Sequence, residues 1–96
     1  MNISVTPAAI ADLEAIRDYI AHFNQRAADQ IIARIDTSIA FLAAFPEIGR
    51  RGRVAGTREL VVSRTPYIVP YRVAGDLIEI LRVFHGSRRW PPEPPS

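Results

Sequence analysis

The sequence predicts an α+β fold, in which an N-terminal strand and an antiparallel two-helix hairpin pack on a mainly antiparallel four-stranded sheet. Three observations predict it. One short β run opens the chain, two amphipathic helical patterns fill residues 7–45, and three β-rich runs fill residues 58–84. Because helical and strand patterns are segregated along the chain, they fit a layer of helices on a sheet.

The first half of the chain predicts the N-terminal strand and the hairpin. Residues 3–6 form the strand, and Thr6 followed by Pro7 is typical of a helix start. Asn24 is typical of an N-cap for the second helix, which Pro46 ends. The turn between the helices is short, so we expect them to run antiparallel with a shared apolar seam. The apolar positions with helical spacing are Ile10, Leu13, Ile16, Ile20 and Phe23, then Ala28, Ile31, Ile32, Ile35, Ile39, Leu42 and Phe45.

The second half predicts the rest of the sheet. Residues 46–57 interleave Gly with Arg and are interpreted as a basic, solvated connector. Runs at 58–64, 67–73 and 77–84 are separated by turn residues, which predicts an antiparallel meander. Pro70 has no N–H for a ladder, so it indicates an edge strand or a bulge. The third run is apolar on both faces and is expected to be central and buried.

Length and composition favour one domain, with residues 1–89 as its body and residues 90–96 as a proline-rich, extended tail. The chain has no Cys, and its two His residues are 63 positions apart, so we expect no metal site and no cofactor. No signal peptide and no apolar run of membrane-spanning length is evident, which predicts a soluble, cytoplasmic protein without membrane contact.

Charge is distributed unevenly along the chain. Residues 1–45 carry three Arg against five acids, whereas residues 46–96 carry nine Arg against five acids. All 12 basic residues are Arg. A basic half favours an acidic partner, either a nucleic acid or an acidic protein segment. Composition bias explains the Arg excess equally well.

Five segments form a recognisable series. They are Ala11-Asp12-Leu13 with Ile16 and Tyr19-Ile20, Phe45-Pro46-Glu47-Ile48-Gly49-Arg50, Gly56-Thr57-Arg58-Glu59-Leu60, Pro66-Tyr67-Ile68-Val69 with Tyr71-Arg72-Val73, and Ile80-Leu81-Arg82-Val83-Phe84-His85-Gly86 with Arg88 and Trp90. In this order they resemble the RelE/ParE toxin superfamily of type II toxin–antitoxin systems, in its ParE-like branch. The resemblance covers nearly the whole chain.

The resemblance implies a growth-inhibiting toxin that a co-expressed antitoxin neutralises by wrapping around it, with DNA contacted only through the antitoxin. The ParE branch is associated with inhibition of DNA gyrase and with plasmid stabilization, whereas the RelE branch cleaves mRNA on the ribosome. The RelE-like catalytic pattern uses Lys and a Tyr near the C-terminal end. This chain has no Lys, and no Tyr follows residue 71. We therefore predict a toxin without catalytic residues that binds a protein target, with DNA gyrase as the target.

The alternative is a ribosome-dependent mRNA endonuclease. Glu59 would be its general base, His85 its general acid, and Arg72 with Arg82 its phosphate clamp. His85 is equally well explained as a half-buried side chain at a strand exit. Arg72 and Arg82 could meet across the hairpin and need an anion, either an internal acid such as Glu79 or a partner's carboxylate.

Partner binding is predicted for the exposed cations of the second half and for the Trp of the tail. Arg and Trp are enriched at binding hot spots. Tyr19 and Tyr67 are expected at the edge of the core with their hydroxyls in water. The predicted partner-binding residues are Arg58, Arg64, Arg72, Arg82, Arg88, Arg89 and Trp90.

Overall fold

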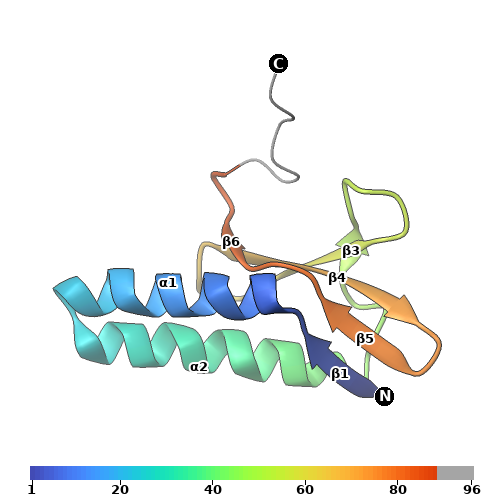
Figure 1. Cartoon of the computed structure of the whole chain (residues 1–96), viewed down its shortest axis with the longest axis horizontal. Coiled ribbons are helices and arrows are strands. Elements are labelled where there is room, and N and C mark those ends of the chain that lie inside the picture. Colours follow the sequence, from blue (N-terminus) through green and yellow to red (C-terminus); the bar gives the residue numbers. More distant parts are fainter. Residues whose placement is uncertain (89–96) are drawn as a thin grey trace.

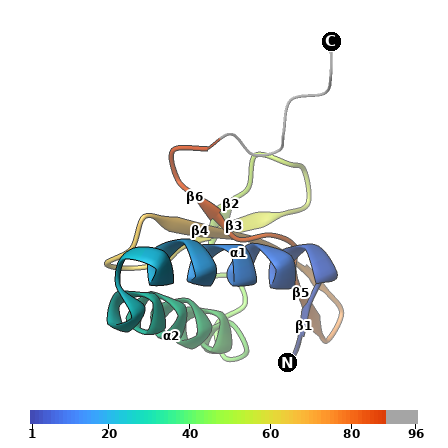
Figure 2. The same cartoon turned by 60° about the vertical axis from the view of Figure 1, so that its left-hand side comes forward.

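The computed structural model describes residues 1–88, which form two layers. A hairpin of α1 and α2 lies on one face of a mixed sheet, and β1 leads from the sheet into α1 (Figures 1 and 2). This arrangement confirms the predicted fold class. The elements are β1 (Asn2–Val5), α1 (Pro7–Phe23), α2 (Gln25–Phe41), β2 (Arg50–Arg51), β3 (Arg58–Val61), β4 (Tyr67–Ala74), β5 (Leu77–Ile80) and β6 (Phe84–His85).

Both predicted helix starts are confirmed. Thr6 accepts a hydrogen bond from the Ala9 N–H, and Asn24 accepts one from the Ala27 N–H, each through its side-chain oxygen. The second helix ends at Phe41, four residues before the predicted end. The apolar period continues beyond the end of the α-helix, because Leu42 remains in the core while the backbone tightens into i to i−3 hydrogen bonds.

The sheet has the strand order β1-β5-β4-β3-β2, and β6 pairs with β4 beyond the end of β5. All pairings are antiparallel except that between β1 and β5. The four strands predicted from the sequence are β1, β5, β4 and β3. The short strand β2 lies inside the basic segment that was interpreted as a solvated connector, and it pairs with the start of β3.

Pro70 lies in the central strand β4, opposite a bulge. Tyr71 pairs with Ile80 and Ile68 pairs with Phe84, so residues 69–70 face residues 81–83. The Pro70 carbonyl accepts a hydrogen bond from Leu81, which places the missing N–H of Pro70 on the same, bulged side. The predicted third strand is therefore divided into β5 and β6.

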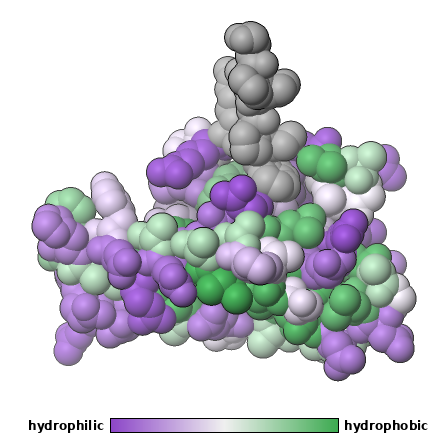
Figure 3. Space-filling view, viewed as in Figure 1, coloured by the Kyte–Doolittle hydropathy of each residue, from purple (hydrophilic) through white to green (hydrophobic). Residues whose placement is uncertain are grey.

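The core lies between the hairpin and the sheet. Alternate residues of β4, namely Tyr67, Val69 and Tyr71, face the helices and pack with Ile35 and Leu42. Hydrophobic residues also gather along the middle of the face that presents the hairpin, with hydrophilic residues around them (Figure 3). Among residues 1–88, neither helix is long and apolar enough to cross a bilayer.

Candidate functional site

The bulge after β5 is held by one carboxylate of α1. Asp12 accepts hydrogen bonds from Arg82 Nε at 2.7 Å and from Arg82 Nη2 at 2.9 Å. It also accepts one from the Val83 N–H at 2.9 Å, a donor that the bulge removes from the β4 ladder. The side-chain hydrogen bond with Asp12 raises the pKa of Arg82, while burial acts in the opposite direction. The bidentate pair fixes the path of the chain from β5 to β6.

This path leaves a hollow between α1 and the end of β6, which we call the α1–β6 pocket. Tyr19 stands on the helix side and is 68% exposed, whereas Tyr67 lies on the sheet side and is 8% exposed. The expectation that both tyrosines lie at the edge of the core is wrong for Tyr67, which faces the helices and belongs to the core, and Tyr19 is instead largely exposed. Burial raises the pKa of the Tyr67 hydroxyl, against the charge of Arg88, which lowers it. The residues that define the pocket here are Ile16, Tyr19, Tyr67, Phe84, His85 and Arg88.

His85 lines this pocket with a fixed tautomer. Its Nδ1 accepts a hydrogen bond from the Ser87 N–H at 3.1 Å, and Ser87 Oγ lies 2.8 Å from the same nitrogen. Because a backbone N–H can only donate, the neutral ring carries its proton on Nε2. The ring packs edge-on against Tyr67, with centroids 5.7 Å apart.

Glu59 lies elsewhere and is 1% exposed. It accepts hydrogen bonds from Arg50 Nη2 at 3.1 Å and from the Arg53 N–H at 3.0 Å, and Arg53 Nε lies 3.9 Å away. Its carboxylate thus closes the basic segment between β2 and β3 onto the sheet. A buried charge held by two Arg residues and a backbone N–H satisfies the requirement for pairing.

Glu59 and His85 lie on opposite faces of the sheet. Glu59 pairs with Pro70, on the face away from the helices, whereas His85 pairs with Tyr67, on the face toward them. Their backbones are also about 14 Å apart, because the two residues are separated by two interstrand spacings across the sheet and by three residues along it. The structure does not bring together the general base and general acid of the nuclease alternative.

The two cations of the proposed phosphate clamp each have an internal acid. Arg72 Nε lies 2.7 Å from Glu79 Oε1, the internal partner considered from the sequence, and Arg82 is bound to Asp12. Both line a shallow pocket together with residues 54–57, so the two side chains do lie near one another.

The remaining predicted cations differ in their surroundings. Arg58 donates to the carbonyls of Glu47 and Gly49, so it supports the turn after α2. Arg64 has a φ of 63° in the turn between β3 and β4, and its carbonyl accepts a hydrogen bond from Arg34. Arg89 and Trp90 lie outside the described residues. Among residues 1–88, no group of three metal-ligating side chains is present.

A second hollow lies between α2 and β3, and we call it the α2–β3 groove. Phe41, Ile48 and Val61 are each about half exposed there. Phe41 also stacks on Phe45, with ring centroids 4.7 Å apart. β2 covers the edge of β3 only at Arg58 and Glu59, which leaves the rest of that edge unpaired among residues 1–88. The residues that define the groove are Phe41, Ile48, Gly49, Leu60, Val61 and Ser63.

Sequence reasoning missed Asp12 and the groove. Helical periodicity does not report the role of Asp12, because its partners lie 70 and 71 positions later. Phe45 was predicted to lie in the apolar stripe of the second helix but is 53% exposed, and no binding role was predicted for Phe41 or Ile48. One signal was available for the groove: apolar residues continue past the helix to Ile48, beyond the Pro that ends it.

The fold and the two hollows define a small α+β protein with a hydrophobic groove, a second pocket rimmed by aromatics and Arg, and a surface rich in Arg. The family described as "ParE toxin of type II toxin-antitoxin system, parDE" matches residues 3–90. The chain therefore belongs to the ParE toxin family of type II toxin–antitoxin systems, within the RelE/ParE superfamily.

Relatives and solved structures agree with this assignment. The chain is 44% identical over 90 residues to the putative toxin Y4kP of Sinorhizobium fredii, covering 94% of this chain and 93% of the relative. It is 46% identical over 80 residues to the toxin RelE2 of Caulobacter vibrioides, covering 83% of this chain and 89% of that toxin. A chain of the chromosomal ParDE system of P. aeruginosa is 34% identical, with a TM-score of 0.79 over 88% of this chain and 95% of its own. A chain of the RelBE2 toxin–antitoxin complex of Mycobacterium tuberculosis shares the fold at 22% identity, with a TM-score of 0.57 over 88% of this chain and 95% of its own.

Proposed function

We propose that this toxin arrests growth by binding DNA gyrase in the cytoplasm, and that a cognate antitoxin neutralises it. The observation that carries the proposal is the separation of Glu59 and His85 onto opposite faces of the sheet. General acid–base catalysis requires both groups within hydrogen-bonding reach of one substrate. Binding a protein target requires instead the exposed apolar and cationic surface that this chain carries.

The α2–β3 groove is the proposed antitoxin site. Its exposed apolar side chains, Phe41, Ile48 and Val61, lie beside the unpaired edge of β3, so an extended apolar segment gains both burial and backbone hydrogen bonds there. Arg64 follows Ser63 at the end of the groove and is exposed, which favours an acidic residue in the antitoxin. Any contact with DNA is proposed to pass through the antitoxin.

The predicted partner-binding cations divide into two groups on this proposal. Arg64 and Arg88 make no ion pair within residues 1–88, so they are the first candidates for acidic groups of a partner. Arg58, Arg72 and Arg82 already hold internal acceptors, and a substitution there perturbs the toxin itself. Arg89 and Trp90 remain proposed contacts.

The test is supercoiling of relaxed DNA by purified gyrase, with the toxin first released from its antitoxin. We expect dose-dependent inhibition or trapped cleaved DNA. A matched pair of variants tests the groove: Phe41→Asp should weaken antitoxin binding, whereas Phe23→Asp, at a more exposed Phe at the other end of the hairpin, should not. Unimpaired supercoiling at saturating toxin would contradict gyrase as the target.

The second candidate is ribosome-dependent mRNA cleavage, and the names of the Caulobacter vibrioides relatives, RelE2 and RelE3, favour testing it. It predicts that His85→Ala abolishes growth arrest and leaves antitoxin binding intact. Primer extension on mRNA from induced cells would reveal cleavage at codon boundaries. Growth arrest by His85→Ala at the wild-type level would contradict this candidate.

A further inference from the structure

The hydroxyl of Tyr67 lacks the partners that its neighbour on the same strand has. Tyr71, four residues later on the same face, donates to the Pro46 carbonyl at 2.8 Å and accepts from the Gly49 N–H at 2.9 Å. Tyr67 is 8% exposed, and its hydroxyl makes no hydrogen bond to any other group within residues 1–88. Buried polar groups are nearly always paired, so this hydroxyl indicates a place for a partner in the α1–β6 pocket.

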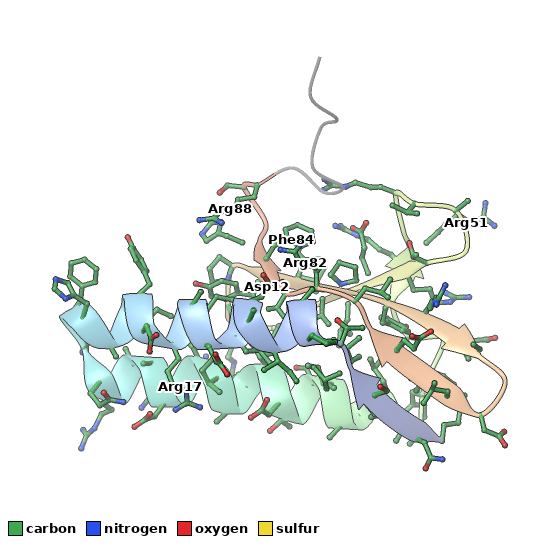
Figure 4. All side chains as sticks on the ribbon, in the orientation of Figure 1. Asp12, Arg17, Arg51, Arg82, Phe84 and Arg88 are labelled. Atoms are coloured by element: carbon green, nitrogen blue, oxygen red, sulfur yellow. The ribbon has the colours of Figure 1, made fainter. Side chains whose placement is uncertain are left out.

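A cation lies at the same place. Arg88 lines the same pocket as Tyr67, and its side chain makes no ion pair within the part of the chain that the structure describes. Asp12 also lines the pocket, but its oxygens are held by Arg82 and by the Val83 N–H. In Figure 4, Asp12 and Arg82 lie together, and Arg88 lies above α1, away from Arg51 in the basic segment. An O–H donor beside an uncommitted guanidinium is suited to an oxygen anion.

Apart from His85 and Ser87, the rest of the pocket lining is hydrophobic or aromatic. Ile16 and Val83 line it, and Tyr19 stands exposed at its rim beside Phe23, with ring centroids 5.5 Å apart. An occupant therefore buries apolar surface next to its anionic group. Nucleic acid fits less well, because its affinity comes from several phosphates at once. Here one cation is uncommitted, and the exposed acids Glu14 and Asp18 lie on the same helix.

We propose that the α1–β6 pocket is a second protein-docking site, which takes an aspartate or glutamate side chain flanked by apolar residues of a partner protein. Tyr67 and Arg88 hold the carboxylate, and Tyr19 covers the neighbouring apolar side chain. The site is separate from the α2–β3 groove, since the two share no lining residue. It does not depend on gyrase being the target.

The test is an NMR titration of the ¹⁵N-labelled full chain with the peptide acetyl-Leu-Glu-Leu-amide. We expect saturable shifts of the backbone amides of Tyr19, Tyr67, His85 and Arg88. The isosteric peptide acetyl-Leu-Gln-Leu-amide should bind at least about fivefold more weakly, because charge-assisted hydrogen bonds are the stronger ones. Inorganic phosphate and a six-nucleotide single-stranded DNA serve as the other sources of an oxygen anion.

Three variants complete the test. Arg88→Gln and Tyr67→Phe should each weaken binding of the Glu peptide at least about fivefold, whereas Arg51→Gln, which removes an exposed Arg outside the pocket, should not. Tyr67→Phe should also keep the wild-type melting temperature, because the lost hydroxyl has no partner in the free chain. Equal binding of the Gln peptide, equal binding by Arg88→Gln, or shifts with DNA alone would each overturn the proposal. A lower melting temperature of Tyr67→Phe would do the same, since it would reveal an internal partner.

Discussion

Replacing Asp12 by Ala tests whether the bulge after β5 depends on a single carboxylate. The substitution removes the acceptor of the Val83 N–H, in a residue that is 2% exposed. Leaving a buried N–H unpaired costs about 1–3 kcal/mol. It also removes the acceptor of both Arg82 hydrogen bonds. The Arg82 side chain is 38% exposed and partly regains water, so we discount its contribution to about 1 kcal/mol.

The two contributions give a loss of about 3 kcal/mol in the free energy of unfolding. For a domain of this size, that corresponds to a fall of roughly 15 °C in the melting temperature. The assay is urea unfolding at neutral pH, followed by far-ultraviolet circular dichroism. Asp12→Asn should cost only about 1 kcal/mol, because its amide oxygen still accepts from the Val83 N–H.

The matched control is Asp29→Ala, which removes the acid of the 3.4 Å ion pair with Arg17. The side chain of Arg17 is 48% exposed and that of Asp29 is 58% exposed. Such surface pairs contribute less than about 1 kcal/mol. If Asp12→Ala lowers the free energy of unfolding no more than Asp29→Ala does, the reasoning about the bulge is refuted. Equal losses for Asp12→Asn and Asp12→Ala would show that charge, not the Val83 hydrogen bond, dominates.

Three further predictions concern Tyr71 and its surroundings. Tyr71→Phe should lower the free energy of unfolding by about 2 kcal/mol in the same assay, since it removes two buried hydrogen bonds and leaves the Gly49 N–H unpaired. An unchanged free energy of unfolding would show that these two hydrogen bonds do not stabilise the fold. Gly49→Ala should cost about 2 kcal/mol, because its Cβ would lie 2.6 Å from Tyr71 Cε1; wild-type stability would show that the ring yields. Burial raises the pKa of both Tyr67 and Tyr71 above the ordinary 10.0, so the folded state holds these protons longer than the unfolded state. The contribution of these two groups to the free energy of unfolding should therefore be fully present below pH 10 and be lost as the pH rises through their folded-state pKa values. The measurement is urea unfolding at a series of alkaline pH values. If Tyr71→Phe loses as much stability at alkaline pH as the wild type does, the contribution of Tyr71 is refuted.

The sequence by itself determined both helices, the four longer strands and their order, because those depend on short-range chemistry. Thr6 and Asn24 cap their helices through bonds to residues three positions later, and no tertiary context is needed for that. The apolar periods predicted both helices, and the turn residues predicted the meander. Pro70 indicated an edge strand or a bulge: its strand is central, and the bulge is present, with the extra residue in the neighbouring strand.

Only the tertiary structure decided which side chains meet. Ile80 faces the helices through its pair with Tyr71, so an unbroken strand would turn His85 to the other face, the face of Glu59. One extra residue at 81–83 reverses this and places His85 beside Tyr67. The contact of Asp12 with Arg82 likewise joins residues 70 positions apart. A strand's side-chain period is two, so a shift of a single residue exchanges the faces, and only the register of the folded sheet fixes that shift.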